Sequence, residues 1–410
     1  MSAFEKFQRF LITVLIAVAF FYGGYYFGKR GYLFEIRKNP PKIEVVNRYP
    51  ANKKVNFDLF WEVWDIVSAK YLERPVDPQK MLYGAISGMV SSLGDPYTSF
   101  LPPEINKVIS DSLNGKYEGI GAELGVRDGN LIIVSPLDGS PAKEMGLKAG
   151  DKIVEIEGKT TFGMTLSEAV AKIRGEAGTT STLKVQTGND KPRDVKIRRR
   201  VINVPSVTWE DKGDGTVYIR VSRFDADTND EWSRVASEVN IKMTELDAIV
   251  IDVRGNPGGY LQSAVYVAEE FFHGKPVLYE ESATGEQKPY MAERVGTFEN
   301  VPGIFVLVDG GSASASEILA SALKVQRGAT LIGERTFGKG TIQEEEKFKD
   351  GSGAHITVSK WLTAAKEWIH KTDDKEGGIQ PDIVVTRTDE EMGKNVDSQL
   401  NRAIELAKEL

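Results

Sequence analysis

A lysine in a glycine-rich stretch is the first residue whose setting suggests chemistry. Residues 333–341 are GERTFGKGT, so Lys339 stands where the lysine of a phosphate-binding loop would stand. Such a loop also needs a Ser or Thr directly after the lysine to hold Mg²⁺, and a helix whose first amides cradle phosphate. Gly340 has no hydroxyl, and the partial alternation on both sides of Asp350-Gly351 predicts a β-hairpin. A nucleotide site is therefore not expected, and Lys339 needs another role.

A loop of small residues, GGSASASEI at 310–318, offers a partner for this lysine. Ser314 and Glu317 precede an apolar run in the pattern of a capping box, so one role for Ser314 is to cap a helix. The alternative is a Ser-Lys dyad, because a lysine desolvated in a pocket loses its charge and can accept the serine proton. The neighbours of Lys339 from 336 to 342 are all neutral, which is compatible with burial.

The composition excludes several classes of protein. At 410 residues the chain is too long for one ordinary domain, so two or three folded units are expected. The formal net charge of −7 gives no basic field for nucleic acid. The chain has no cysteine, and its histidines lack metal-ligand spacing, so we predict neither a metal nor a cofactor. Ordinary strand and loop positions are expected for all three histidines: His273, His355 and His370.

The chain begins with an apolar stretch long enough to cross a membrane. Residues 10–27 carry no charge, and about 18 such residues suffice for a helix to span a bilayer. The small residues AVA at 17–19 are followed by further apolar residues, which favours an uncleaved anchor over a removed signal peptide. We predict a tail and transmembrane helix at 1–28, with the remaining domains extracytoplasmic, either periplasmic or at the cell surface. The basic, proline-containing residues 29–55 are expected to form an extended linker.

Helices are predicted at 56–104 and again at the C-terminus, within 389–410. Apolar side chains at helical spacing between Phe57 and Val67 form one face, and a second helix starts at Pro78 with Asp77 as its N-cap. The C-terminal helix also has an apolar face, made by Leu400, Ile404 and Ala407. These faces belong either to the core or to a contact with a second protomer.

The segment 105–190 changes to short strands and glycine turns and resembles a PDZ domain. The resemblance rests on Gly119-Ile120-Gly121 and on SPAKEMGLKAGDKIVEIEG at 140–158. In PDZ domains an extended C-terminal peptide adds to an open sheet edge, and backbone amides bind its carboxylate. The resemblance implies that Gly119, Ile120 and Gly121 form the carboxylate-binding loop. A spacer domain without a ligand is the alternative.

Strands and helices alternate between 191 and 388. Buried strands lead into three glycine-rich segments, at 255–259, 310–314 and 336–340. Strands that are apolar on both faces and joined through helices predict an α/β core with a parallel component. Loops after the strands hold the site in such folds, so these three segments are the candidate site.

Several motifs closely resemble those of the carboxyl-terminal processing, or tail-specific, proteases. They are DVRGNPGG at 252–259, GGSASASEI and TFGKGTIQ at 336–343. GDPYTSFLPPE at 94–104 and GIQPDIVV at 378–385 also fit, so the resemblance covers roughly 56–388. It implies a serine endopeptidase with an α/β core of the ClpP/crotonase-like type, which acts on proteins or peptides with free C-termini.

The same resemblance assigns the site residues. Ser314 corresponds to the nucleophile and Lys339 to the general base, while Gln343 orients the lysine by accepting its hydrogen bond. The amides of Ala315 and of the Gly258-Gly259 loop correspond to the oxyanion hole.

The sequence departs from the family pattern at two places. Val325 stands where many relatives carry an aspartate. The family strand Tyr-x-Thr-Pro-x-Gly is replaced by WLTAAK at 361–366, so Ala364 and Lys366 take the places of Pro and Gly. These changes leave the geometry of the substrate groove open.

Two rival functions are less well supported. Ser321 and Lys324 fit the S-x-x-K of penicillin-binding proteins, but no K-T-G or S-D-N follows. A catalytically silent, membrane-tethered PDZ scaffold has no need for Ser314, Lys339 and Gln343 together. We therefore predict a membrane-anchored serine endopeptidase whose PDZ domain recognises an apolar C-terminus and gates the site. A homodimer or an adaptor protein is a further expected partnership, and nucleic acid is not.

Overall fold

A computed structural model gives the fold of the chain. It describes all residues except 1–2, 30–31, 39–40, 48–56, 388–395 and short interruptions at 116, 128–129, 137–138, 149, 165, 189, 203–204, 244, 373 and 375. The chain forms two compact units, Met1–Ala85 and Ile86–Leu410.

The N-terminal part of the chain holds the apolar helix and the first predicted helices. Helix α1 (Ala3–Lys29) contains the stretch Lys6–Tyr26, which by length and composition can cross a membrane. Helix α2 (Asp58–Lys70) buries none of its residues. Helix α3 (Pro78–Ser91) begins at the predicted proline. The predicted N-cap is confirmed, because Asp77 Oδ1 accepts hydrogen bonds from the amides of Gln79, at 2.9 Å, and Lys80, at 3.2 Å.

The segment 29–55 differs from the expected extended linker. Strands β1 (Tyr32–Lys38) and β2 (Pro41–Asn47) pair antiparallel over their whole length. The β-branched residues of β2 favour a strand, and Pro41 takes its first position, where proline is tolerated. Residues 48–56, which belong to the same prediction, lie outside the described residues.

The middle of the chain forms a sheet with the strand order β10-β9-β7-β6-β5. These strands are β5 (Ala122–Arg127), β6 (Asn130–Pro136), β7 (Lys152–Ile156), β9 (Thr180–Gln186) and β10 (Arg193–Arg198), with β8 (Lys159–Thr160) paired to β7. Helices α5 (Pro141–Glu144) and α6 (Leu166–Ile173) complete the domain, and β4 (Tyr117–Gly119) pairs with β11 (Arg200–Ile202). Strand β10 was expected in the following domain, but Val195 and Ile197 bury their side chains in this core. Strand β5 is left at the sheet edge.

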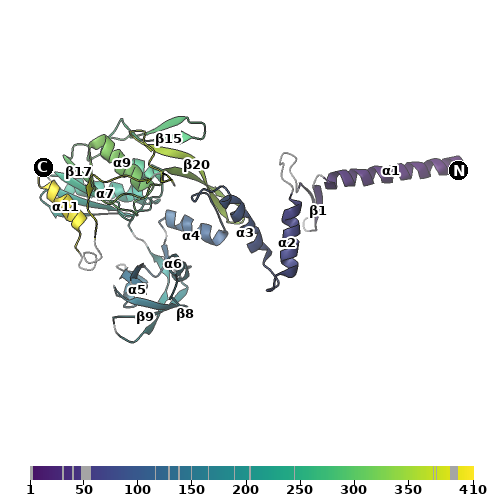
Figure 1. Cartoon of the computed structure of the whole chain (residues 1–410), viewed down its shortest axis with the longest axis horizontal. Helices are drawn as coiled ribbons and strands as arrows, with labels where there is room; N and C mark the ends of the chain where they lie inside the picture. The colour runs from purple at the N-terminus through teal and green to yellow at the C-terminus, as the bar shows by residue number, and fades with distance from the viewer. Residues whose placement is uncertain are drawn as a thin grey trace. The chain divides into compact units, whose positions relative to one another are not determined.

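The predicted parallel α/β core is present in the C-terminal half. Its sheet has the order β12-β13-β14-β17-β18-β21, and every pairing is parallel except that of β12 with β13. The strands are β12 (Val207–Gly213), β13 (Thr216–Val221), β14 (Ala248–Asp252), β17 (Gly303–Val308), β18 (Thr330–Gly333) and β21 (Ile383–Val384). Helices α7 (Thr228–Lys242), α8 (Leu261–Ala268) and α9 (Ala315–Arg327) cover one face of the sheet, and α11 (Ser398–Ala407) covers the other (Figure 1).

A second, antiparallel sheet packs on the far side of α9. Its order is β16-β15-β20-β19, made by β15 (Pro276–Ser282), β16 (Gln287–Met291), β19 (Thr341–Lys347) and β20 (Gly353–Thr363). The hairpin predicted around Asp350-Gly351 is therefore confirmed. Strand β3 (Ser99–Leu101), followed by α4 (Pro103–Leu113), pairs with β20 and brings the motif at 94–104 to this sheet. Because α9 lies between two sheets, its residues from Ala315 to Leu323 are all buried.

The C-terminal helix belongs to the core. Leu400, Ala403 and Ala407 pack against buried residues of β14, β17 and β18. At the start of α11, Asp397 accepts two hydrogen bonds from Arg254, from Nη1 and Nη2, at 2.8 Å each. Arg254 also binds Asp252 at the end of β14 and Gln399 of α11. Burial alone would raise the pKa of the Asp397 carboxyl, but its hydrogen bonds with Arg254 and Leu400 hold the pKa below its ordinary value.

We expect Asp397→Asn to lower the free energy of unfolding by about 1–3 kcal/mol at neutral pH, since a hydrogen bond to a charged group is worth about that much. Asparagine can still cap α11, so the change tests the ion pair. A carboxyl with a lowered folded-state pKa stabilises the fold above its unfolded-state pKa of about 3.9, and this contribution is lost as the pH falls further.

The difference between the parent and the variant should therefore shrink below about pH 4 in urea unfolding experiments. Glu405→Gln, in an exposed ion pair with Arg402 on the same helix, is the control and should change stability by less than about 0.5 kcal/mol. A difference that stays constant from neutral to acid pH contradicts this assignment.

Candidate active site

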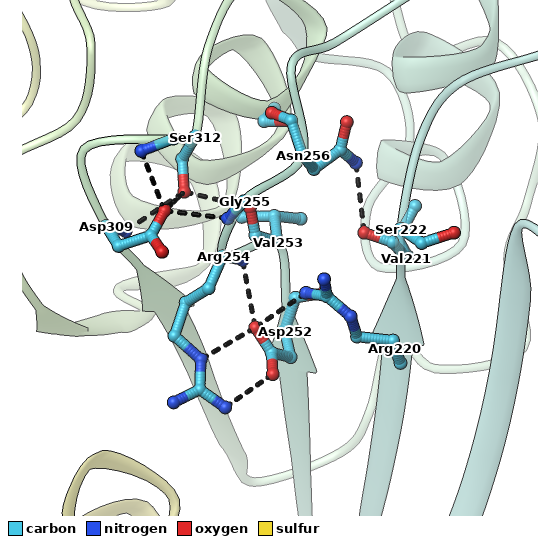
Figure 2. Close-up of polar contacts among 12 residues, drawn as sticks. Arg220, Val221, Ser222, Asp252, Val253, Arg254, Gly255, Asn256, Asp309 and Ser312 are labelled. Carbon is cyan, nitrogen blue, oxygen red and sulfur yellow. Dashed lines mark hydrogen bonds and ion pairs between the residues drawn. The ribbon is translucent and has the colours of Figure 1, made fainter. Parts of the chain in front are cut away.

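The loop after β14 is fixed to the loop after β17 by hydrogen bonds (Figure 2). Asp309 Oδ1 accepts from the amides of Gly255, at 2.7 Å, and Gly311, at 2.9 Å. The buried Asn256 donates its side-chain amide to Val221 O at 3.0 Å, and its backbone oxygen accepts from the Ala313 amide at 3.0 Å. Two of the three glycine-rich segments therefore meet at one edge of the parallel sheet, as predicted.

The three serines of the second loop have different surroundings. Ser312 Oγ donates to Val253 O at 2.8 Å, and Ser316 Oγ donates to Asn256 O at 2.9 Å. Both residues are fully buried, so their hydroxyls hold the loops together. Ser314, between them, is only partly buried. It is the serine of this loop that solvent can still reach.

The backbone of Ser314 is strained. Its φ of 54° and ψ of −114° lie in a region that favours glycine, and such a conformation costs a non-glycine residue on the order of 1–3 kcal/mol. The residue directly precedes α9 and lies against Gly258, where an added Cβ would be 2.9 Å from Ser314 Cβ. In α/β-hydrolases the nucleophilic serine also lies on a sharp, strained strand-to-helix turn.

The buried carboxylate of Glu317 joins this turn to the segment that carries Lys339. Its Oε2 accepts from the amides of Ser314, at 2.8 Å, and Lys339, at 2.9 Å. Its Oε1 accepts from the Gly338 amide at 2.7 Å and from Thr336 Oγ1 at 2.6 Å. Burial raises the pKa of the Glu317 carboxyl, although these four hydrogen bonds oppose the shift. The sequence predicted the contact with Ser314 as part of a capping box, but gave no signal for the other three.

Lys339 is half-buried, and aromatic residues surround its segment. Its Nζ lies 5.1 Å from the centre of the Tyr97 ring, within range of a cation–π interaction. Its backbone oxygen accepts from Trp361 Nε1 at 2.9 Å. Burial lowers the pKa of the Lys339 amine, and the carboxylates of Asp95 and Glu317 offset only part of that effect. The expected shift toward a neutral amine is therefore present in direction.

The other predicted residues have these positions. Gln343 Nε2 donates to the hydroxyls of Thr341, at 2.9 Å, and Thr357, at 3.1 Å. Within the described residues, no hydrogen bond joins Gln343 to Lys339. The Gly258 amide donates to Asn256 Oδ1 at 2.9 Å, which differs from a free oxyanion donor. In the described part of the chain, the amides of Ala315 and Gly259 have no protein acceptor.

The loop proposed to bind a peptide carboxylate lies at the start of the middle domain. Ile120 is buried, and its backbone oxygen accepts from the Ala142 amide at 2.8 Å. Gly121 has a φ of +72°, and an added Cβ would be 2.4 Å from Ser140 Cβ, so glycine is required there. Gly119 ends β4 and pairs with Arg200. The next strand, β5, is the open edge to which an extended peptide can add.

The penicillin-binding-protein alternative does not fit the structure. Ser321 is buried within α9, and its hydroxyl donates to Ile318 O of the same helix at 3.1 Å. Lys324 forms an ion pair with Asp382 at 2.7 Å. Neither side chain is available as a nucleophile or a base.

The segment 361–366, which departs from the family pattern, ends in a turn. Lys366, in place of the family glycine, has a φ of 64°, and its amide donates to Thr363 O at 2.8 Å. Val325 is exposed on α9.

Among the described residues, no group of three or more His, Asp or Glu side chains could hold a metal ion.

Known families match three parts of the chain. Residues 215–385 match peptidase family S41, 132–187 match the PDZ domain, and 16–104 match the activating protease CtpB N-terminal domain.

Two bacterial proteases are similar over most of the chain. The carboxy-terminal processing protease CtpB of Bacillus subtilis (strain 168) is 40% identical over 337 residues, which cover 81% of this chain and 68% of that protein. The carboxy-terminal processing protease CtpA of the same strain is 37% identical over 328 residues, 80% of this chain and 68% of that protein. Among solved structures, the photosystem II D1 C-terminal processing protease aligns with a TM-score of 0.52 and 27% identity, over 80% of this chain and 86% of that one.

We expect Glu317→Gln to weaken the connection between the turn at Ser314 and the segment 336–339. Glutamine has only one side-chain oxygen that can accept hydrogen bonds. Its NH₂ group would take the place of the second carboxylate oxygen and would point at backbone N–H groups, which are donors and cannot bind it. The free energy of unfolding should fall by about 2–4 kcal/mol, because buried donors lose their partners. Hydrogen exchange at the Gly338 and Lys339 amides, followed by mass spectrometry, should become faster.

The control is Glu344→Gln, on the exposed part of β19, for which neither quantity should change. Unchanged exchange at 338–339 in the Glu317→Gln protein would show that other contacts hold the Lys339 segment.

Proposed function

Since the chain belongs to peptidase family S41 and is a serine-type carboxyl-terminal processing peptidase with a PDZ domain, we propose that Ser314 is its nucleophile and Lys339 its general base. One observation carries this assignment: a single buried carboxylate, that of Glu317, binds the backbone amides of both residues. The partly exposed position of Ser314 and the lowered pKa of Lys339 support it. A silent scaffold is not supported, because the chain has the sequence of an active protease family.

The proposed reaction is acyl transfer to Ser314. The neutral Lys339 amine accepts the hydroxyl proton as Ser314 Oγ bonds to the carbonyl carbon of the peptide, and then donates that proton to the leaving amine. Water releases the acyl-enzyme in a second step of the same kind. The oxyanion is assigned to the amides of Ala315 and of the Gly258-Gly259 loop. Within that loop Gly259 is the better donor, because the Gly258 amide already donates to Asn256, whereas no described residue accepts from the Gly259 amide. Gln343 uses its NH₂ group on two threonines, which leaves its oxygen to accept from Lys339.

The PDZ domain is assigned the recognition of the substrate tail. The tail would add to strand β5, with its carboxylate at Gly119-Ile120-Gly121, and its apolar side chains would provide selectivity. Binding of a tail would then feed the chain toward Ser314 and gate the site. The substrates are accordingly proteins or peptides with free C-termini.

The N-terminal helix is proposed to be an uncleaved membrane anchor. The stretch Lys6–Tyr26 has the length of a bilayer-spanning helix, and no residue of its most apolar part is buried within the protein. We assign the short N-terminal tail to the cytoplasm, so that the PDZ and protease domains lie outside it. The parallel sheet with helices α8 and α9 supports a core of the ClpP/crotonase-like type.

The dyad is tested with the full chain in detergent micelles and an unfolded protein that ends in an apolar tail. Ser314→Ala and Lys339→Ala should each lower kcat by at least about 10³-fold, as loss of a covalent nucleophile or its base does elsewhere. Products are identified by mass spectrometry. Because Lys339 acts as the neutral amine and its pKa is lowered, kcat/KM should rise with pH and level off below the ordinary lysine pKa of about 10.4.

The matched controls are Ser321→Ala and Lys324→Ala, a serine and a lysine of α9 outside the site, which should keep activity within about 3-fold. Retained cleavage in either dyad variant rules out that residue's assigned role.

The anchor is tested by expressing the full chain in a bacterium and extracting membranes with alkaline carbonate. The parent should stay in the membrane with its first residues intact, as judged by N-terminal mass analysis. Leu15→Arg combined with Val18→Arg should release it, because each arginine costs about 2.5–3.5 kcal/mol near the bilayer centre. A mature N-terminus directly after residue 19 would identify the helix as a cleaved signal instead.

A further inference from the structure

The segment 368–371 lines the backbone on both sides of Lys339. The Lys371 amide donates to Gly338 O at 2.9 Å, and Trp368 Nε1 donates to Gly340 O at 2.9 Å. The Gly340 amide donates to His370 Nδ1 at 3.1 Å. The peptide groups before and after Lys339 are therefore both held by this one segment.

This packing explains why a glycine follows the lysine. A Cβ at Gly340 would lie 2.8 Å from Trp368 Nε1 and 3.0 Å from both Cβ and N of His370. A serine or threonine there would push His370 away from the Gly340 amide. The close packing against His370 therefore requires glycine at 340, and this is why the chain lacks the hydroxyl that a phosphate-binding loop needs.

The His370 ring is fixed by its aromatic neighbours. It stacks on Trp368, with ring centroids 5.1 Å apart and an angle of 12° between the planes. Tyr97 approaches it edge-on at 5.8 Å, and the same Tyr97 ring has Lys339 Nζ over it at 5.1 Å. A change at His370 can therefore alter the position of Lys339 in two ways, through the hydrogen bond to the Gly340 amide and through contact with the Tyr97 ring.

We propose that His370 is a positioning residue for Lys339 and a proton-sensitive latch on its segment. The neutral imidazole, with its proton on Nε2, accepts the Gly340 N–H and holds the lysine segment in place. A second proton, on Nδ1, would face the Gly340 N–H, so the bond is lost and the segment is released. This inference rests on the proposed role of Lys339 as the base.

The charges around the ring determine the pH at which the latch opens. Asp95 and Tyr97 act on the ring from the motif at 94–104. The Tyr97 ring in turn has Lys339 Nζ over it and interacts electrostatically with the Glu317 carboxyl. Burial lowers the pKa of His370, and the Asp95 carboxylate opposes this shift only in part. His370 is therefore neutral and the latch closed at neutral pH. It opens as the pH falls below the ordinary histidine value of about 6.5.

The first test measures the hydrogen bond itself, independently of catalysis. In the full-length Ser314→Ala protein in micelles, two-bond ¹H–¹⁵N NMR spectra report the tautomer of each of the three histidines. The latch requires an unprotonated Nδ1 at His370 at neutral pH, and a pKa below about 6.5. An Nδ1–H tautomer, or a pKa at or above that value, overturns the proposal whether or not Ser314 and Lys339 are the dyad.

The second test uses two substitutions that separate the acceptor from the ring. His370→Asn keeps an acceptor at the place of Nδ1 but cannot titrate, and His370→Phe keeps the ring stack but has no acceptor. We expect His370→Phe to lower kcat by about 10- to 100-fold with KM within 2-fold, the loss expected when a buried donor is left unpaired. His370→Asn should keep kcat within about 3-fold at neutral pH and lose one ionisation from the acid limb of the pH profile.

His273→Asn is the matched control, since His273 pairs with Glu299 in an exposed position and should not alter the profile. Thermal melts show whether each variant is folded. Wild-type kcat in a folded His370→Phe protein, or an unchanged acid limb in His370→Asn, overturns the latch. If Lys339→Ala is itself fully active, the dyad fails, and the NMR result alone decides whether His370 holds the Gly340 amide.

Discussion

The site depends on one buried carboxylate, that of Glu317. Helix α9 is enclosed between two sheets, so a charge near its first turn cannot be solvated by water. The four donors around the carboxylate replace that solvation, and they come from both the helix start and the segment 336–339. Separating the two segments would remove donors from a buried charge. The free-energy cost of leaving that charge uncompensated keeps the segments together. The strained turn at Ser314 is maintained by the same contacts.

Local sequence patterns predicted the elements better than they predicted the contacts between them. The capping box, the N-cap at Asp77, the hairpin after Lys339 and the parallel strands are all set by residues close in sequence. The contacts of Glu317 with 336–339 span about twenty residues, and that of His370 with Gly340 spans thirty. No periodicity encodes such contacts, and His370 was accordingly interpreted as an ordinary loop residue. For Ser314 the local pattern left a capping role and a Ser-Lys dyad both open, and resemblance to a family favoured the dyad.

One domain boundary and the role of the C-terminal helix were hard to fix from sequence for the same physical reason. Val195 and Ile197 of β10, which were expected in the following domain, and Leu400 and Ala407 of α11, for which core and protomer contact were both open, show apolar alternation or a helical face. The partner of each lies elsewhere in the chain. The pattern identifies a buried face without identifying what buries it. Lys366 is a different case, because it has a left-handed backbone within a local turn, where its amide donates to Thr363 O, although its residue type does not favour that conformation.

Opposing effects act on the proton of the Lys339 amine, and the net result is a lowered pKa. Burial disfavours the ammonium form, whereas Asp95, Glu317 and the face of Tyr97 favour it. The side chain is still partly open to solvent. A peptide that covers the site would remove that remaining water and strengthen the desolvation, while the carboxylates stay engaged by their own hydrogen-bond donors. Substrate binding would therefore shift the amine toward its neutral, basic form at the moment when Ser314, as the proposed nucleophile, needs a proton acceptor.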